Sequence, residues 1–149
     1  LKNMRSFLNR NKNFFLDNGR PQSPRNQLQI NAPDLSAGEL YLWAWCEMYL
    51  RFQALSQNPK IDKSAQLRTD QLTDADRIAA FFDELDLPHG PITLEQPMNT
   101  NVFQGLSETR VSAEDVACYK SFVRRIPPNI LGRITYLRDY DPERALVAA

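Results

Sequence analysis

The basic side chains near the start of the chain have the types and spacing that could hold an anion. Residues 1–33 carry six Lys or Arg against one acid, Asp17. A solvated basic face is the other interpretation of this cluster, since clustered surface charge needs no ligand. Both interpretations involve the same five side chains, those of Arg5, Arg10, Lys12, Arg20 and Arg25.

The remaining reactive side chains give weaker signals. His89 lies in a Pro-His-Gly loop, where no motif places a Ser or Cys beside it, so we expect an ordinary loop histidine. Asp70 follows a strand-like run and is expected to be a turn or cap residue rather than a catalytic carboxylate. Cys46 and Cys118 make neither a CxxC metal spacing nor a disulfide framework. The residues alone therefore assign no catalytic group and predict no metal.

The elements that must position these residues are mostly helices. A hydroxyl residue three positions before a carboxylate is typical of a helix start, and this pattern occurs at Ser36, Thr73 and Ser112. Apolar residues at helical spacing predict a fourth helix from about Leu1. The helix after Ser36 is apolar nearly all round and is expected to be central. The large side chains that we expect to be buried are Trp43, Phe52, Phe81, Phe82 and Val123.

Two long loops and one isolated strand-like run complete the chain. Residues 17–35 and 86–111 are rich in Pro and Gly and predict loops. Residues 65–69 have strand character, but a strand needs a pairing partner for its backbone groups. Either this run is not a strand, or its sheet is supplied from elsewhere.

Length and charge limit the possible class of protein. The 149 residues fit a single helical domain or a partial domain, and the formal net charge is zero. No basic stripe interleaves with exposed aromatics, so nucleic acid is not an expected partner. No apolar run is long enough for a membrane span. A soluble, cytoplasmic protein is expected.

Several stretches together resemble one enzyme family. Gln66-Leu-Arg-Thr-Asp-Gln-Leu72 is followed by a helical stretch ending Asp83-Glu-Leu-Asp-Leu-Pro88. This layout is similar to the "hRYEDL" strand end and "FLGLP" helix end of the sulfotransferases that use 3'-phosphoadenosine 5'-phosphosulfate. Met4-Arg-Ser-Phe-Leu8, the aromatic helix of residues 43–52, and Leu106-Ser107 with the helix from Ser112 resemble further pieces of that family, in order. The resemblance covers about residues 1–136.

The resemblance implies the C-terminal part of an α/β fold of the P-loop-like type, whose parallel sheet comes from an upstream region or another chain. It implies 3'-phosphoadenosine 5'-phosphosulfate as the cofactor, Ser6 and Arg5 as ligands of its 3'-phosphate, and no metal. The sulfonate group would pass to a hydroxyl or amine of a small-molecule, carbohydrate or protein acceptor. The chain departs from the family at Thr69-Asp70, where Tyr-Glu is usual.

The family's glycine-rich phosphate loop, its arginine-proline turn and its general base do not occur in the chain. We therefore expect no activity from this chain alone. The alternative is a non-catalytic, all-helical domain for protein–protein interaction, with the aromatic helix as core and the long loops as partner surface.

Overall fold

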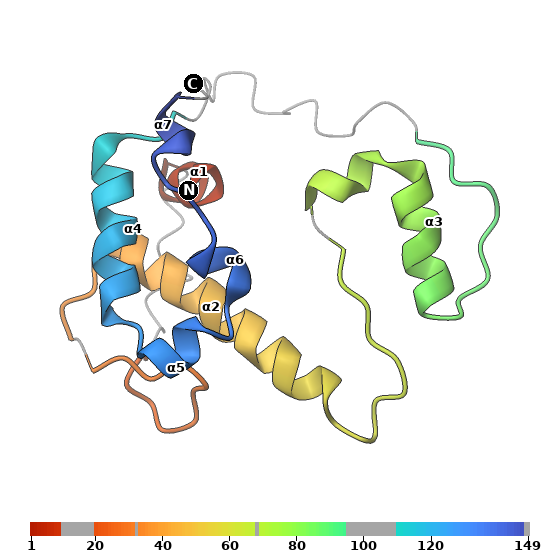
Figure 1. Cartoon of the computed structure of the whole chain (residues 1–149), viewed down its shortest axis with the longest axis horizontal. Helices are drawn as coiled ribbons and strands as arrows, with labels where there is room; N and C mark the ends of the chain where they lie inside the picture. Colours follow the sequence, from red (N-terminus) through yellow and green to blue (C-terminus); the bar gives the residue numbers. More distant parts are fainter. Residues whose placement is uncertain (10–19, 32, 68, 95–109, 148–149) are drawn as a thin grey trace. The chain divides into compact units, whose positions relative to one another are not determined.

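The computed structural model describes residues 1–9, 20–31, 33–67, 69–94 and 110–147. Over these residues the chain forms helices joined by irregular segments and contains no strand. The prediction of a mostly α chain is confirmed. The chain divides into two compact units, each considered by itself (Figure 1). Unit 1 comprises Leu1–Gln53 and Glu108–Ala149, and unit 2 comprises Ala54–Ser107.

Unit 1 contains two long helices and several short ones. The start predicted near Leu1 and the starts predicted at Ser36 and Ser112 are confirmed, and the last three residues of α2 belong to unit 2. Short helices near the C-terminus follow Pro127 and Pro142, because proline tolerates a helix start. The bounds are α1 Lys2–Asn9, α2 Ala37–Ser56, α4 Ala113–Arg125, α5 Pro128–Leu131, α6 Thr135–Arg138 and α7 Arg144–Val147.

Capping boxes begin both long helices. The Asp115 backbone N–H donates to the Ser112 hydroxyl at 3.2 Å, and the Ser112 N–H donates to the Asp115 carboxylate at 2.8 Å. The same reciprocal pair joins Glu39 to Ser36, at 3.3 and 2.9 Å. Each box satisfies amides that the first turn leaves without a helical partner. The three-residue spacing in the sequence therefore predicted both starts correctly.

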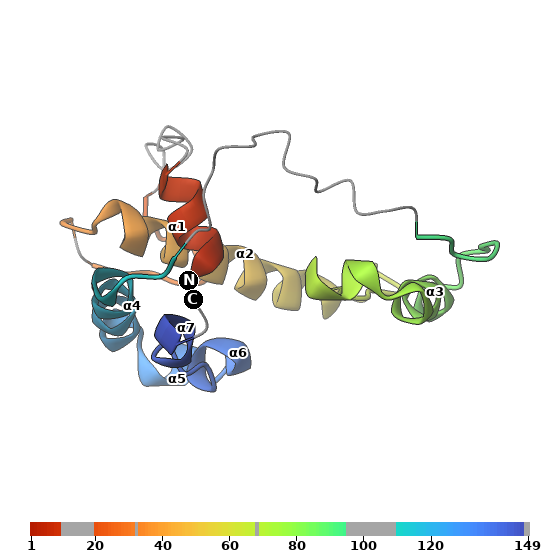
Figure 2. The ribbon, with the colours of Figure 1, turned by 90° about the horizontal axis from the view of Figure 1, so that it is seen from above.

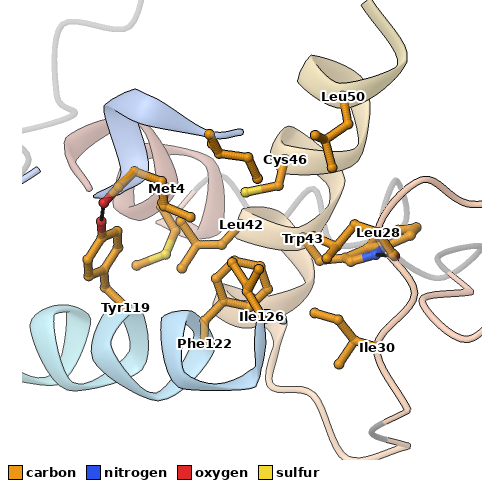
Figure 3. Close-up of a cluster of buried hydrophobic side chains, with 12 residues drawn as sticks. Met4, Leu28, Ile30, Leu42, Trp43, Cys46, Leu50, Tyr119, Phe122 and Ile126 are labelled. Carbon is orange, nitrogen blue, oxygen red and sulfur yellow. Dashed lines mark hydrogen bonds between the residues drawn. The ribbon is translucent and has the colours of Figure 1, made fainter. Parts of the chain in front are cut away.

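The core of unit 1 lies between α2 and α4. Phe122 and Ile126 of α4 point toward Leu42 of α2, and Trp43 lies against the segment before α2 (Figure 3). The expected burial of Trp43 is confirmed, whereas Phe52 and Val123 are only partly buried. The buried apolar cluster consists of Met4, Leu28, Ile30, Leu42, Trp43, Cys46, Leu50, Tyr119, Phe122, Ile126, Ile134 and Leu137.

Gly38 allows α2 to approach α4 closely. A Cβ atom at Gly38 would lie 2.7 Å from the Cys118 sulfur and 3.5 Å from the Met4 sulfur. Such a distance to Cys118 is shorter than real contacts allow, so any side chain here would push the helices apart. Figure 2 shows α1 and α4 near this same end of α2. The glycine thus brings three helices together where both capping boxes lie.

The described part of the first long loop packs on α2. The Trp43 indole N–H donates to the Leu28 carbonyl at 2.9 Å. The buried Glu47 carboxylate accepts from the backbone N–H groups of Gln27 and Leu28, at 3.1 and 2.8 Å, and from Arg51 at 2.6 Å. Buried backbone groups need such partners when no strand or helix supplies them. Glu47 therefore fixes the loop to the helix.

In unit 2 the strand-like run of residues 65–69 forms no strand in its described positions. Residues 65–67 have no regular structure, and Thr69–Thr73 form the 3-10 helix η2. The described part of the chain offers these residues no second strand, and a strand without a neighbour leaves its backbone groups unpaired. The two alternatives for this run, no strand at all or a strand whose sheet is supplied from elsewhere, are both consistent with this structure.

The next helix, α3, spans Ala75–Glu84 and starts one residue later than the cap predicted at Thr73 implies. Its cap is Asp74, whose side chain accepts the Arg77 backbone N–H at 3.1 Å. Thr73 instead closes η2. Phe81 and Phe82 were expected to be buried, but both are only partly buried. In fact α3 has no buried residue.

A residue in the left-handed conformation ends α3. Asp86 has φ 52°, the Asp86 N–H donates to the Asp83 carbonyl at 3.0 Å, and the Leu87 N–H donates to the Phe82 carbonyl at 2.9 Å. This is the pattern of a Schellman motif, in which glycine is the usual left-handed residue. Pro88 follows and prevents the helix from continuing. The Leu-Asp-Leu-Pro sequence thus encodes a helix stop.

Candidate functional site

Arg5, one of the two predicted cofactor ligands, lies in a bidentate ion pair. Its Nε donates to Oδ2 of Asp115 at 2.9 Å, and its Nη2 donates to Oδ1 at 2.5 Å. Nη2 also lies 3.4 Å from the Ser112 hydroxyl. Arg5 comes from α1 and Asp115 from the first turn of α4. The pair therefore ties two helices together at the capping box of α4.

The ion pair keeps Asp115 charged although the side chain is buried. Burial opposes ionisation and is the largest single influence, but hydrogen bonds from Arg5 and Ser112 outweigh it and lower the pKa of Asp115. The hydrogen bond to Asp115 raises the pKa of Arg5. Arg5 thus binds a carboxylate of its own chain. A phosphate could bind Arg5 only by sharing its guanidinium with Asp115 or by displacing Asp115.

Ser6, the second predicted ligand, is partly buried on α1. Successive residues of a helix point about 100° apart, so Ser6 and Arg5 leave α1 in different directions. Arg20 and Arg25 are exposed in the segment before α2. Arg10, Lys12 and the side chain of Asp70 lie outside the described residues. Of the five basic side chains, the structure therefore describes only Arg5, Arg20 and Arg25.

A second charged network, not expected from the sequence, joins α2 to α4. The buried Glu39 carboxylate accepts from the Ser121 hydroxyl at 2.9 Å and lies 3.3 Å from Nε of Arg125. Arg125 also reaches Asp34 at 3.3 Å. The sequence suggested only that Arg125 complements the negative end of its helix. The capping-box pattern identified Glu39, but no local pattern pointed to its partner.

His89 in unit 2 bridges the loop after α3 back to that helix. Its Nδ1 lies 2.9 Å from the Gly90 carbonyl, and its Nε2 lies 3.1 Å from Oδ1 of Asp83. Both partners are oxygen acceptors, and only the imidazolium form can donate from both nitrogens. The hydrogen bond to Gly90 and then that to Asp83 raise the pKa of His89. The prediction of a loop histidine agrees with this position.

We expect the His89 resonance to titrate above the ordinary histidine pKa, about 6.5, and Asp83→Asn to lower that pKa. A raised folded-state pKa stabilises the fold below the unfolded-state pKa, and this contribution is lost as pH rises through the folded-state pKa. His89 is the only histidine, so an NMR titration of its ring protons is unambiguous. Glu84→Gln, which removes a carboxylate paired with Arg77 on the same helix, is the control. Equal pKa values in all three proteins would contradict the contact.

Comparisons of the chain with protein-family models, with curated proteins and with solved structures find no match. Within the described residues, no three His, Cys, Asp or Glu side chains gather where a metal ion could bind. None of the helices in those ranges is both long and apolar enough to cross a membrane. The candidate site therefore has to be interpreted from its own geometry and from the sequence patterns.

Proposed function

We propose that this chain is the C-terminal part of a sulfotransferase-like protein that transfers a sulfonate group from 3'-phosphoadenosine 5'-phosphosulfate to a hydroxyl or amine. The observation that carries the proposal is the state of residues 65–88. This segment has the order of a strand-to-helix unit, and the described residues include no sheet for it to pack on.

Two features of the segment support this interpretation. Residues 61–67 form neither helix nor strand, and α3 presents Ile78, Phe81 and Phe82 without burying any of them. An amphipathic helix gains most of its stability by packing its apolar face. Because the apolar face of α3 is partly exposed, we infer that a further surface packs on it. A sheet supplied by an upstream region or by another chain would pair with the extended run and cover that face.

The cofactor role of α1 follows from the sequence resemblance. In this proposal Ser6 donates its hydroxyl to the 3'-phosphate, and Arg5 supplies a charged donor beside it. Charge-assisted hydrogen bonds of this kind are roughly twice as strong as neutral ones. Transfer would be an in-line displacement of the sulfonate by the acceptor, with no metal and no covalent enzyme intermediate. The acceptor is a small molecule, a carbohydrate or a protein.

The test is calorimetric titration of the complete protein with adenosine 3',5'-bisphosphate and with adenosine 5'-monophosphate. We expect the bisphosphate to bind more tightly, and the difference to shrink with added salt because it arises from one phosphate group. Ser6→Ala should reduce the difference. Failure of both nucleotides to bind would reject the proposal, as would equal binding of the two.

Arg5 needs a matched control, because Arg5→Ala also breaks the ion pair with Asp115. Asp115→Asn weakens the same pair and leaves the guanidinium in place. We expect bisphosphate binding to fall in Arg5→Ala and to persist in Asp115→Asn. An equal loss in both variants would mean that Arg5 acts only through the fold.

A second function has its own supporting observation. On α2, Trp45 and Met48 of unit 1 expose 45 and 70% of their surface. Large apolar side chains gathered on one surface are typical of protein interaction sites. A non-catalytic helical interaction domain therefore remains the alternative. It predicts binding to another protein through α2 and no preference between the two nucleotides.

A further inference from the structure

A pocket of about 180 Å³ lies in unit 1, among α1, α2, α4 and the C-terminal helices. Five of its ten lining residues are aromatic: Tyr41 and Trp45 from α2, Tyr119 from α4, Tyr136 from α6, and Tyr140 after it. Tyr119 lies close to Met4 and Leu42, which also line the pocket (Figure 3).

The inner wall is held in place by the fold. Tyr119 is 6% exposed, and its hydroxyl donates to the Leu137 carbonyl at 2.5 Å. The Trp45 and Tyr136 rings meet edge to face with centroids 4.0 Å apart, and Tyr119 meets Tyr140 at 5.3 Å. Trp45 and Tyr140 are the exposed side chains of the group. Rigid inner walls with two open rings at the surface make a preformed pocket of the kind that binds small ligands.

The lining selects for neutral, aromatic chemistry. No charged side chain of the described residues lines the pocket, and burial raises the pKa of Tyr41 and Tyr119, so both hydroxyls stay neutral. An anion would lose hydration without gaining a charged side chain as partner. A cation would gain only the ring faces that the edge-to-face pairs leave open. A ring would instead gain edge-to-face and offset contacts with the wall. An apolar protein cavity of about 150 Å³ is known to accept benzene, so the volume suits a single ring.

We propose that this pocket, bounded by Tyr41, Trp45, Tyr119, Tyr136 and Tyr140, binds a neutral compound that carries one aromatic ring. The inference goes beyond the proposed function and does not depend on it, because it uses neither Ser6 nor a nucleotide. The ring occupies the space between α2 and α4 with its edge against the inner wall, and Trp45 and Tyr140 cover its outer side.

The test is ligand-observed NMR titration of the complete protein with three probes. Benzyl alcohol is the neutral aromatic probe, cyclohexylmethanol lacks the aromatic ring, and benzyltrimethylammonium adds a charge. We expect saturable binding of benzyl alcohol, about three- to tenfold tighter than that of cyclohexylmethanol, which is the range that one aromatic contact gives. Tighter binding of the cation, equal binding of the two alcohols, or no saturation by benzyl alcohol would each overturn the proposal.

Two substitutions in the pocket and one outside it test where the ligand binds. Tyr140→Ala removes a ring at the surface, and Asn3→Phe fills the pocket from α1. Both side chains are exposed. Tyr140→Ala also removes the ring contact with Tyr119, whereas Asn3→Phe removes no ring. We expect each to weaken benzyl alcohol binding by about three- to tenfold. Met48→Ala, an exposed apolar position of α2 outside the pocket, is the matched control and should leave binding unchanged. Equal binding by all three variants would place the ligand elsewhere and contradict the assignment.

Discussion

Phe122→Ala is expected to lower the free energy of unfolding of unit 1 by about 3–5 kcal/mol, the usual loss for a large aromatic side chain in a core. Phe122 is fully buried, at 0% exposure, and points from α4 toward α2 (Figure 3). Removal of the ring leaves a cavity where these two helices meet. Both tryptophans of the chain lie in unit 1, so urea unfolding followed by tryptophan fluorescence measures this loss.

Phe52→Ala is the matched control for this measurement. It makes the same chemical change on α2, but its side chain is only partly buried. We therefore expect a smaller loss, about 1–2 kcal/mol, in proportion to the apolar area returned to water. Equal losses in the two variants would show that the core of unit 1 is not centred between α2 and α4.

Asp115→Ala is expected to cost about 2–4 kcal/mol at neutral pH, because it removes a helix cap and one partner of a largely buried ion pair. The Asp115 side chain is 2% exposed and that of Arg5 is 29% exposed. The measurement is a double-mutant cycle with Arg5→Ala, by urea unfolding of all four proteins. The double variant should lose less than the sum of the single losses, since both changes remove the same contact. Additive losses would mean that the pair does not contribute as a unit.

The pH dependence of this pair has a definite sign. The pKa of Asp115 is lower in the folded state than in the unfolded state. Its contribution to stability is therefore present above the unfolded-state pKa and is lost as pH falls through the folded-state pKa. Wild-type protein should lose stability on acidification, and Asp115→Asn should lose less. Parallel pH curves for the two proteins would contradict this assignment.

Short-range patterns predicted the parts of the fold that short-range contacts stabilise. The Ser36 and Ser112 caps act over three residues, and both were correct. The start at Thr73 was displaced to Asp74, because two neighbouring residues can both cap a helix and Thr73 was used by η2. Alternative caps of similar strength cannot be ranked from the sequence alone.

Contacts between residues far apart in the sequence could not be predicted from local patterns. Arg5 and Asp115 are 110 positions apart, and Glu39 and Ser121 are 82 apart, so no periodicity linked them. A basic residue near a helix start suggested an anion, and the anion that it meets is a carboxylate of the same chain. The strand-like run of residues 65–69 needs a neighbouring strand, and the described residues contain none, so the two alternatives left open for it both remain. Local β propensity without a partner does not specify a strand.

Amide hydrogen exchange over residues 65–69 tests the central claim most directly, because the account requires this segment to pair with a sheet from outside the chain. The measurement compares the complete protein with the present chain alone. We predict slow exchange of alternate amides in the complete protein, as expected for a paired strand, and fast exchange in the chain alone. Equally fast exchange in both would show that no sheet receives these residues, and it would contradict the proposed α/β parent.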